Sequence, residues 1–428
     1  MKKLVTWSLL FSSVVLLGAC GSKSDTSSSD TSDSSKLIAW AWDPTYNVKA
    51  LEEADKVYEP DTTNLKVVAS SQDDIVQKLN TALSASNKDG LPSIILIEDY
   101  KAQGFLKSYP DAFEDLSDIV DKDKFADYKF ASVSKDDKIY GIPFDSGVTG
   151  MFYRTDLLEE AGYSDADLQN ITWDDYMKIG KDVKEKTGKA MLSLDPSDLG
   201  LVRVIMQSAG TWYTDEDGKV DIASNKALKE GLEIYTNLIK EGIAESVSGW
   251  DAGVEAVNTG AVASATIGSW YSSSIMQAED QSGKWKIAPT PRLADISESV
   301  NASNSGGSSW YVLKGVGDTD KAKEFLKETF ASSTDLMQTL TKEIGLISTL
   351  KESINTDIYQ EPVAFYGDQK VYAHFSESMT KVPNLNYGTD TYAIEAIVAE
   401  YAQRAINGED LDSLLKEAQT QVEASVDQ

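Results

Sequence analysis

Three short apolar segments near the start of the folded chain decide its architecture: residues 37–42 (LIAWAW), 65–69 (LKVVA) and 93–97 (SIILI). Each is short enough for a strand, and the last is an unbroken apolar run, which is typical of a strand buried on both faces of a parallel sheet. We therefore predict three strands that belong to one buried sheet.

The segments between these strands have helical spacing. Residues 48–58 form one such segment, and in the next Ile75, Leu79 and Leu83 recur at i, i+4 and i+8, with Asp73 expected to cap the helix. Strand, helix, strand, helix, strand is the pattern of an α/β fold with a mostly parallel sheet.

Such sheets bind ligands beyond the carboxyl ends of their strands. The loops at these ends contain Asp43 after the first strand, Ser71 and Gln72 after the second, and Glu98 and Asp99 after the third. We expect these five side chains to meet at one edge of the sheet and to contact a ligand.

The rest of the chain continues the mixed pattern. Residues 261–268 (AVASATIG), 285–288 (WKIA) and 310–313 (WYVL) are predicted strands, and Thr172 begins a capped helix. The last third is rich in helices. We find no internal repeat and no Pro- or Gly-rich linker, so any two lobes must share several crossing segments.

The first residues have the features of an export signal. Lys2 and Lys3 precede an apolar run, and the run ends in Leu17-Gly18-Ala19-Cys20. Small residues before a cleavage site mark a secretory signal peptide, predicted at 1–19, and the Cys after them looks like a bacterial lipobox. An uncleaved membrane anchor is the alternative, but the apolar run is shorter than a helix that spans a bilayer needs.

Residues 20–35 follow as a lipidated Cys20 and a tether of mostly Ser and Asp, which cannot pack. The chain has a single Cys, so the folded body has no thiol and no internal disulfide. We expect an exported globular protein that a lipid holds on the outer face of a bacterial membrane.

The composition excludes several partners. The net charge is −29 and only four residues are Arg, which argues against nucleic acid, against an anionic lipid surface and against an anionic ligand.

Motifs for catalysis are also missing. A phosphate loop, a dinucleotide loop and a G-x-S-x-G elbow are absent, His374 is the one imidazole, and residues 215–218 (DEDG) form only part of a calcium loop. Paired carboxylates are unavoidable among 69 acidic residues. We expect a binding protein with no catalytic residues, no cofactor and no metal.

The tryptophans give the positive signal. Trp42, Trp212 and Trp270 adjoin polar loops, while Trp250 lies in a Ser-Gly-Trp-Asp stretch. A flat aromatic ring matches the apolar face of a sugar, and carboxylates accept hydrogen bonds from its hydroxyls. The alternative is that each Trp belongs to the core, which we expect for Trp173, Trp285 and Trp310.

Together these segments resemble the sugar-binding lipoproteins of bacterial ABC importers, the family 1 extracellular solute-binding proteins, and within them the lactose and arabinose-oligosaccharide subgroup. The resemblance runs from about Leu37 to Val426. It is carried by the order and spacing of residues 91–96 (LPSIIL), 140–147 (YGIPFDSG), 152–156 (FYRTD), 281–285 (QSGKW), 301–310 (NASNSGGSSW) and 367–369 (GDQ).

The resemblance implies a class II periplasmic-binding-protein-like fold: two α/β lobes, a ligand cleft between them and multiple crossover segments. The expected N-terminal lobe is 36–145 plus 289–335, and the C-terminal lobe is 146–288 plus 336–428. Further ligand contacts are implied at Asp145 near the first crossover, and at the aromatic residues Trp212, Trp270, Tyr366 and Tyr387. Many relatives carry two Gly before the Gln of residues 367–369, where this chain has Asp368.

The implied role is that of a monomer that captures a neutral oligosaccharide and delivers it to the permease subunits of an ABC transporter, and through them to an ATPase. Three alternatives stay open at this point: the same fold with a cationic ligand such as a polyamine, a surface glycosidase, and a lipid-tethered adhesion module.

Overall fold

The computed structural model describes residues 37–58 and 65–426. The predicted signal peptide, the lipidated Cys20 and the tether fall on residues 1–35 and lie outside the described residues. In the described ranges, none of the helices combines the length and the apolar character that a bilayer span needs.

A five-stranded sheet contains the three predicted strands. Its order is β2-β1-β3-β12-β6, and β1 pairs in parallel with both β2 and β3. The sheet and the helices packed on it form what we call the first lobe. The strands are β1 (Ile38–Ala41), β2 (Lys66–Ala69), β3 (Ile94–Glu98), β6 (Gly141–Asp145) and β12 (Ser308–Val312).

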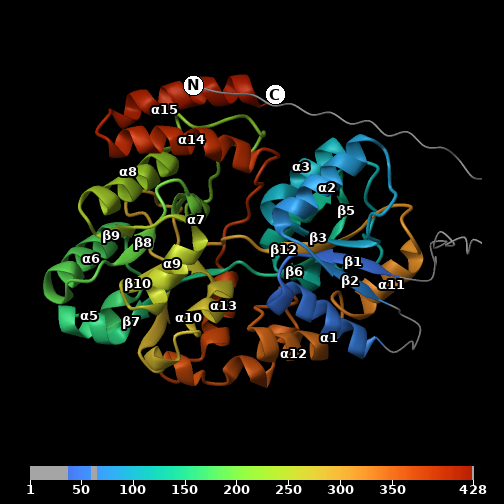
Figure 1. The fold of residues 1–428 in the computed structure, drawn as a ribbon, viewed down its shortest axis with the longest axis horizontal. Coiled ribbons are helices and arrows are strands. Elements are labelled where there is room, and N and C mark those ends of the chain that lie inside the picture. The colour runs from blue at the N-terminus through green and yellow to red at the C-terminus, as the bar shows by residue number, and fades with distance from the viewer. Residues whose placement is uncertain (1–36, 59–64, 427–428) are drawn as a thin grey trace, which may run out of the picture. The chain divides into compact units, whose positions relative to one another are not determined.

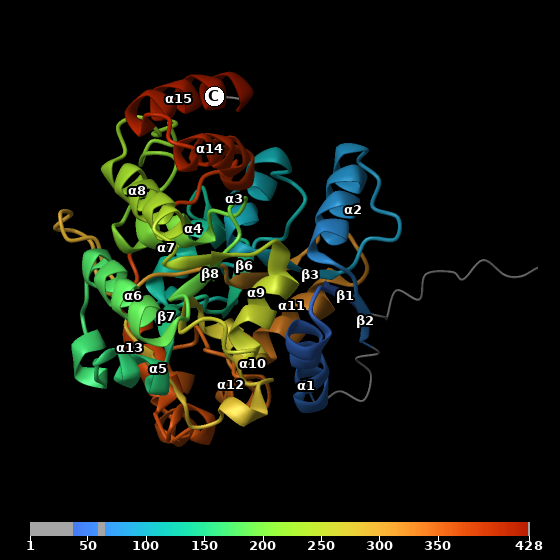
Figure 2. The same ribbon diagram turned by 60° about the vertical axis from the view of Figure 1, so that its left-hand side comes forward.

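Helices cover both faces of this sheet. Figures 1 and 2 show α2 (Gln72–Ser84) and α3 (Asp99–Ser108) on one face, and α1 (Lys49–Val57) and α12 (Thr334–Ile344) on the other. This arrangement explains the unbroken apolar run of β3, whose residues Ile94, Ile95, Leu96 and Ile97 are all buried. The lobe also contains α4 (Phe130–Val133), β4 (Ser134–Lys135), β5 (Lys138–Ile139) and α11 (Thr319–Glu328).

The predicted cap of α2 was wrong. The helix begins at Gln72, and Ser71 is its N-cap, because the Ser71 hydroxyl accepts a hydrogen bond from the Asp74 amide at 3.2 Å. Asp73 lies in the first turn instead, where a negative charge is favourable beside the helix N-terminus.

Strand β12 is antiparallel to both of its neighbours, β3 and β6. The chain returns to the sheet here from the second half of the sequence, and it enters beside the carboxyl ends of β3 and β6. Its first residue, Ser308, therefore pairs with Glu98 on one side and with Asp145 on the other.

A second lobe surrounds a three-stranded antiparallel sheet of order β10-β7-β11. The predicted capped helix is confirmed as α6, where Thr172 and Asp175 form a reciprocal capping box. Figure 1 shows the helices of this lobe around its sheet. The elements are β7 (Thr149–Arg154), β10 (Ser264–Gly268), β11 (Trp285–Ala288), the pair β8 (Leu192–Leu194) and β9 (Ala244–Ser246), and α5 (Thr155–Ala161), α6 (Trp173–Thr187), α7 (Gly200–Ser208), α8 (Lys226–Lys240), α9 (Gly249–Asn258), α10 (Ser272–Ile275), α13 (Val371–Met379), α14 (Thr391–Ile406) and α15 (Leu411–Ser425).

The segments that cross between the lobes are hydrogen-bonded to one another. The Ser146 amide donates to the Ile347 carbonyl at 3.0 Å, and the Ser305 amide donates to the Gly147 carbonyl at 2.7 Å. The described chain thus crosses in three strands of backbone that lie side by side, as the absence of a single linker in the sequence predicts.

The lobe boundaries stay a prediction. Leu336, Met337 and Leu340 of α12 belong to the apolar core of the first lobe. This packing favours a last crossing after Ile344 rather than at residue 335.

The close packing of the crossing segments predicts the effect of one methyl group. A Cβ at Gly147 would lie 2.3 Å from the Ser305 carbonyl oxygen, so the backbone must move. We expect Gly147→Ala to lower the free energy of unfolding by about 1–3 kcal/mol, measured by urea denaturation. Gly253→Ala is the control: its nearest neighbour would be 4.0 Å away and α9 gains a better helix former, so stability holds or rises by up to ~1 kcal/mol. Equal stability of the two variants would contradict the packing described.

Candidate functional site

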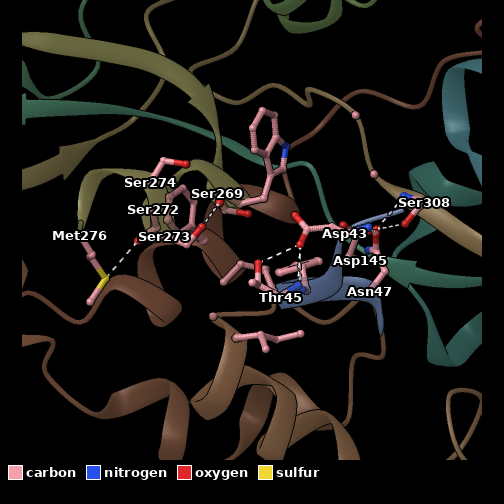
Figure 3. Close-up of a pocket in the computed structure, with 18 of the residues that line it drawn as sticks. Asp43, Thr45, Asn47, Asp145, Ser269, Ser272, Ser273, Ser274, Met276 and Ser308 are labelled. Atoms are coloured by element: carbon pink, nitrogen blue, oxygen red, sulfur yellow. Dashed lines mark hydrogen bonds between the residues drawn. The ribbon is translucent and has the colours of Figure 1, made fainter. Parts of the chain in front are cut away.

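A pocket of about 680 Å³ lies between the lobes, where the carboxyl ends of β1, β3 and β6 face the loop after β10. Figure 3 shows Asp43, Asp145 and Ser308 on one side of it and the serines 272–274 with Met276 on the other. The lining residues are Trp42, Asp43, Thr45, Tyr46, Asn47, Gln72, Glu98, Asp145, Trp250, Ser269, Trp270, Ser272, Ser273, Ser274, Met276, Gly306, Gly307, Ser308, Lys342, Glu343, Ile344, Gly345, Ile347, Val363, Tyr366, Val371, Tyr372 and Phe375.

The carboxylate of Asp43 is held in one orientation. Its Oδ1 accepts hydrogen bonds from the Thr45 amide and hydroxyl, both at 2.8 Å, and from the Tyr46 amide at 3.1 Å. These contacts arise because Asp43 caps the short helical turn Pro44–Val48 that follows β1. Within the described part of the chain no donor reaches Oδ2, which leaves this oxygen free to accept a hydrogen bond from a ligand.

Asp145 and Ser308 form a second fixed group. Asp145 Oδ1 accepts hydrogen bonds from the Ser308 amide and hydroxyl, each at 2.6 Å, and Asp145 is only 6% exposed. Burial raises the pKa of Asp145, although Lys129 and the Ser308 donors oppose this shift. The pair therefore presents a small, rigid polar surface to the pocket.

Glu98 lines the pocket with its oxygens already occupied. Tyr392 donates to Oε1 at 2.7 Å, while Lys101 at 2.6 Å and Gln72 at 3.3 Å donate to Oε2. Since Tyr392 belongs to α14, its bond joins the first lobe to the second. Glu98 thus acts as a link between the lobes, and its charge is balanced by Lys101.

Two tryptophans form an aromatic surface in the second lobe. The rings of Trp250 and Trp270 lie 5.7 Å apart with an angle of 34°, and Tyr271 meets Trp250 edge-on at 5.3 Å. The Trp270 indole N–H donates to the Ser305 carbonyl at 2.9 Å, which fixes its ring against a crossing segment. Trp250 is 53% exposed, so one large apolar surface remains open to a ligand.

Several hydroxyl groups line the pocket beside these rings. Ser272 Oγ and Tyr366 Oη are hydrogen-bonded at 2.7 Å, and the Ser273 hydroxyl donates to the Trp270 carbonyl at 3.1 Å. Met276, which is 41% exposed, also lines the pocket. This side of the pocket combines apolar faces with neutral polar groups.

Most of the predicted ligand residues line the pocket, and four do not. Trp42, Asp43, Gln72, Glu98, Asp145, Trp250, Trp270 and Tyr366 belong to its wall. Ser71 caps α2, and Asp99 is buried against Lys129, with 2.5 Å between Oδ2 and Nζ.

Trp212 and Tyr387 lie in an aromatic cluster away from the pocket. Both contact Tyr100 of α3, at ring distances of 5.2 Å and 4.7 Å, and Trp212 donates its indole N–H to Thr391 at 3.0 Å. They are almost fully buried and fill the contact of α3 with the second lobe. Asp368, the departure from the family pattern, is exposed and is not part of the pocket wall.

Sequence reasoning missed several parts of the wall. The run of serines 272–274 follows Trp270 and Tyr271, shortly after the end of β10, so its closeness to a predicted ligand residue could have pointed to it. The end of α12, with Lys342 and Glu343, and Tyr372 of α13 carry no such signal, because they lie on helices far along the chain.

Two α/β lobes joined by three crossing segments around one pocket define a solute-binding protein. The chain belongs to the family of bacterial extracellular solute-binding proteins, whose pattern matches residues 48–366. The family is extracellular, and its members are binding proteins of ABC transporters. The predicted family is thereby confirmed.

Two relatives, each named for the sugar it binds, match most of this chain. A lactose-binding protein of Rhizobium radiobacter is 40% identical over 394 residues, which are 91% of this chain and 93% of the relative. An arabinooligosaccharide-binding protein of Bacillus subtilis is 27% identical over 336 residues, 76% of each chain.

Solved structures confirm the predicted fold. The GacH receptor of Streptomyces glaucescens matches with a TM-score of 0.75 and 18% identity over 91% of this chain and 97% of its own. An ABC-transporter-associated binding protein of B. animalis subsp. lactis, solved with β-1,6-galactobiose, matches with a TM-score of 0.72 and 21% identity over 91% of this chain and 96% of its own.

The buried Asp99 predicts a pH dependence of stability. Burial raises its pKa to about 6, so between roughly pH 4 and 6 the folded chain keeps a proton that the unfolded chain has released. This contribution to the free energy of unfolding grows as the pH falls through that window. In Asp99→Asn it is absent, so the free energy of unfolding should drop more steeply on acidification from pH 6 to 4.

Urea denaturation at both pH values measures this difference. Asp368→Asn, at an exposed position, is the control and should keep the slope of the wild type. An unchanged slope in Asp99→Asn would show that this carboxyl does not hold the proton.

Proposed function

We propose that this protein captures a neutral oligosaccharide in the pocket between its lobes and delivers it to an ABC transporter. One observation carries the proposal: a fixed carboxylate oxygen of Asp43 and the open face of Trp250 line the same cavity. A sugar needs both, because its ring faces are apolar and its rim carries hydroxyl donors.

The charges of the pocket favour a neutral ligand over an anionic one. Asp43, Asp145 and Glu343 line it without a basic partner of their own at salt-bridge distance among the described residues, and Lys342 is the lining residue of opposite sign. A uronate or phosphate group would meet these carboxylates with no Arg to bind it bidentately. The names of the relatives, lactose-binding and arabinooligosaccharide-binding, support the same class of ligand.

Capture would use both lobes. A sugar in contact with Asp43 on the first lobe and with Trp250 on the second favours the arrangement in which both contacts form. The protein then acts as a monomeric carrier without catalytic activity, and the permease subunits with their ATPase carry out transport. Cys20, outside the described residues, would anchor the protein by a lipid to the outer face of the membrane.

Titration with a panel of neutral oligosaccharides, followed by Trp fluorescence, tests the proposed ligand. We expect Asp43→Asn to bind the responding sugar about fivefold more weakly, because hydrogen bonds to a charged acceptor are worth roughly 1 kcal/mol more than neutral ones. Asn still caps helical turns, so the variant should fold.

Asp368→Asn removes a carboxylate outside the pocket and should bind as the wild type does. The proposal would be contradicted if the wild type bound no sugar of the panel but bound a polyamine with an affinity that falls steeply with salt.

Growth of a bacterial host with labelled fatty acid tests the anchor. The chain has a single Cys, so Cys20→Ser should abolish incorporation of the label and release the protein from the membrane fraction. Ser22→Ala, two residues away, should keep both. Equal labelling of Cys20→Ser would disprove lipidation at this position.

A further inference from the structure

Lys129 is a fully buried lysine, with 0% of its surface exposed. Its Nζ donates to Asp99 Oδ2 at 2.5 Å, to the Asp145 backbone carbonyl at 2.9 Å and to the Ser308 backbone carbonyl at 3.0 Å. An ammonium group has three donors, and each of them has an acceptor here.

The three acceptors come from three elements at one edge of the sheet. Asp99 begins α3 directly after β3, Asp145 ends β6, and Ser308 begins β12, which lies between those strands. The register of β12 against β6 shifts between Ser308 and Ser309, so the regular ladder is interrupted at this point. Asp145 and Ser308 are the pair at this irregularity, and the Lys129 ammonium donates a hydrogen bond to the carbonyl of each.

The other side of this pair is the wall of the pocket. Asp145, Gly307 and Ser308 line the pocket, whereas Lys129 and Asp99 do not. Gly307 lies directly over the ion pair: a Cβ there would be 2.9 Å from Asp99 Oδ2 and 3.2 Å from Lys129 Nζ. With φ at +93°, the backbone at Gly307 also has a conformation that other residues rarely adopt.

Burying these charges costs free energy. Two carboxylates, Asp99 and Asp145, lie beside Lys129. Burial is the largest cause of the raised pKa of each. An ion pair of this kind is often no more stable than apolar side chains of the same volume. What the ammonium supplies, and an apolar side chain cannot, is a donor for the two carbonyls at the edge of the pocket.

We propose that Lys129 is a positioning residue of the pocket: its bonds to the carbonyls of Asp145 and Ser308 hold the Asp145 carboxylate and the Gly307–Ser308 backbone in the orientation that meets the ligand. Lys129 itself does not touch the ligand. The inference rests on the proposed function for its effect on affinity, and on the fold alone for its effect on the backbone.

Four variants of the full chain test this role: Lys129→Met, Asp99→Asn, the two combined, and Lys135→Met. In Lys129→Met affinity should fall because the two carbonyls lose their donor, and stability should fall because Asp99 is left as an unpaired buried charge. In the double variant that charge is removed, so the urea midpoint should move back towards the wild type, while affinity stays at least tenfold weaker.

Asp99→Asn alone keeps the bonds from Lys129 to both carbonyls and should bind within about threefold of the wild type. Lys135→Met is the matched control. Its ammonium also donates to a backbone carbonyl, that of Leu106 at 2.9 Å, but neither residue lines the pocket. It should leave affinity unchanged.

Two readouts separate this inference from the proposed function. Isothermal titration with lactose, and with the panel sugar that the wild type binds best, measures affinity. Amide hydrogen exchange of residues 304–309, measured without any sugar, reports the backbone itself and should be faster whenever Lys129 is replaced. If the wild type binds no sugar, the proposed function fails and the exchange still tests the positioning.

Wild-type affinity and wild-type exchange in the folded double variant would overturn the inference. If the Lys129 variants do not fold, Asp99→Asn decides: retained affinity with unchanged exchange supports positioning by Lys129, whereas a tenfold loss assigns the effect to the Asp99 charge and overturns it.

Discussion

The hydrogen bonds among the three crossing segments are the constraint on which the rest of the molecule depends. Ser146 is bonded to Ile347, Gly147 to Ser305, and the Thr149 amide to the Ser303 carbonyl at 2.9 Å. Separate linkers would leave each crossing free to bend in its own way. Because these three are bonded to one another, they must bend together, and the two walls of the pocket keep a common axis.

The chemistry of the pocket follows from this layout. The first lobe contributes polar groups at strand ends, where Asp43 and Asp145 are fixed by short backbone contacts. The second lobe contributes rings on a loop and on a helix, Trp270 and Trp250. A ligand that contacts both the Asp43 carboxylate of the first lobe and the open face of Trp250 in the second therefore has to bridge the lobes.

The spacing of apolar residues predicted the strands and helices correctly. The pattern that buries β3 and the helix faces lies in neighbouring residues and can be read from the sequence alone. Asp43, Gln72 and Glu98 were predicted at the pocket because they follow the carboxyl ends of β1, β2 and β3, which the sequence also locates. The sequence did not reveal that Tyr392 occupies an oxygen of Glu98, since that contact joins residues nearly three hundred positions apart. Trp212 has the same local sequence character as Trp270, and only its tertiary contacts with Tyr100, Tyr387 and Thr391 place it in the core.

The position of Trp250 has a consequence for how ligand choice can evolve. The ring stands in the first turn of α9, whose start is fixed by a hydrogen bond from the Gly249 amide to the Asp195 carboxylate at 2.6 Å. Since the ring is half exposed and the start of the helix is held by its backbone, replacing Trp250 removes less buried surface than replacing a core tryptophan does. Trp250 can therefore change at a lower cost in stability than a core tryptophan, so mutation can sample new ligands at this position while the fold is kept.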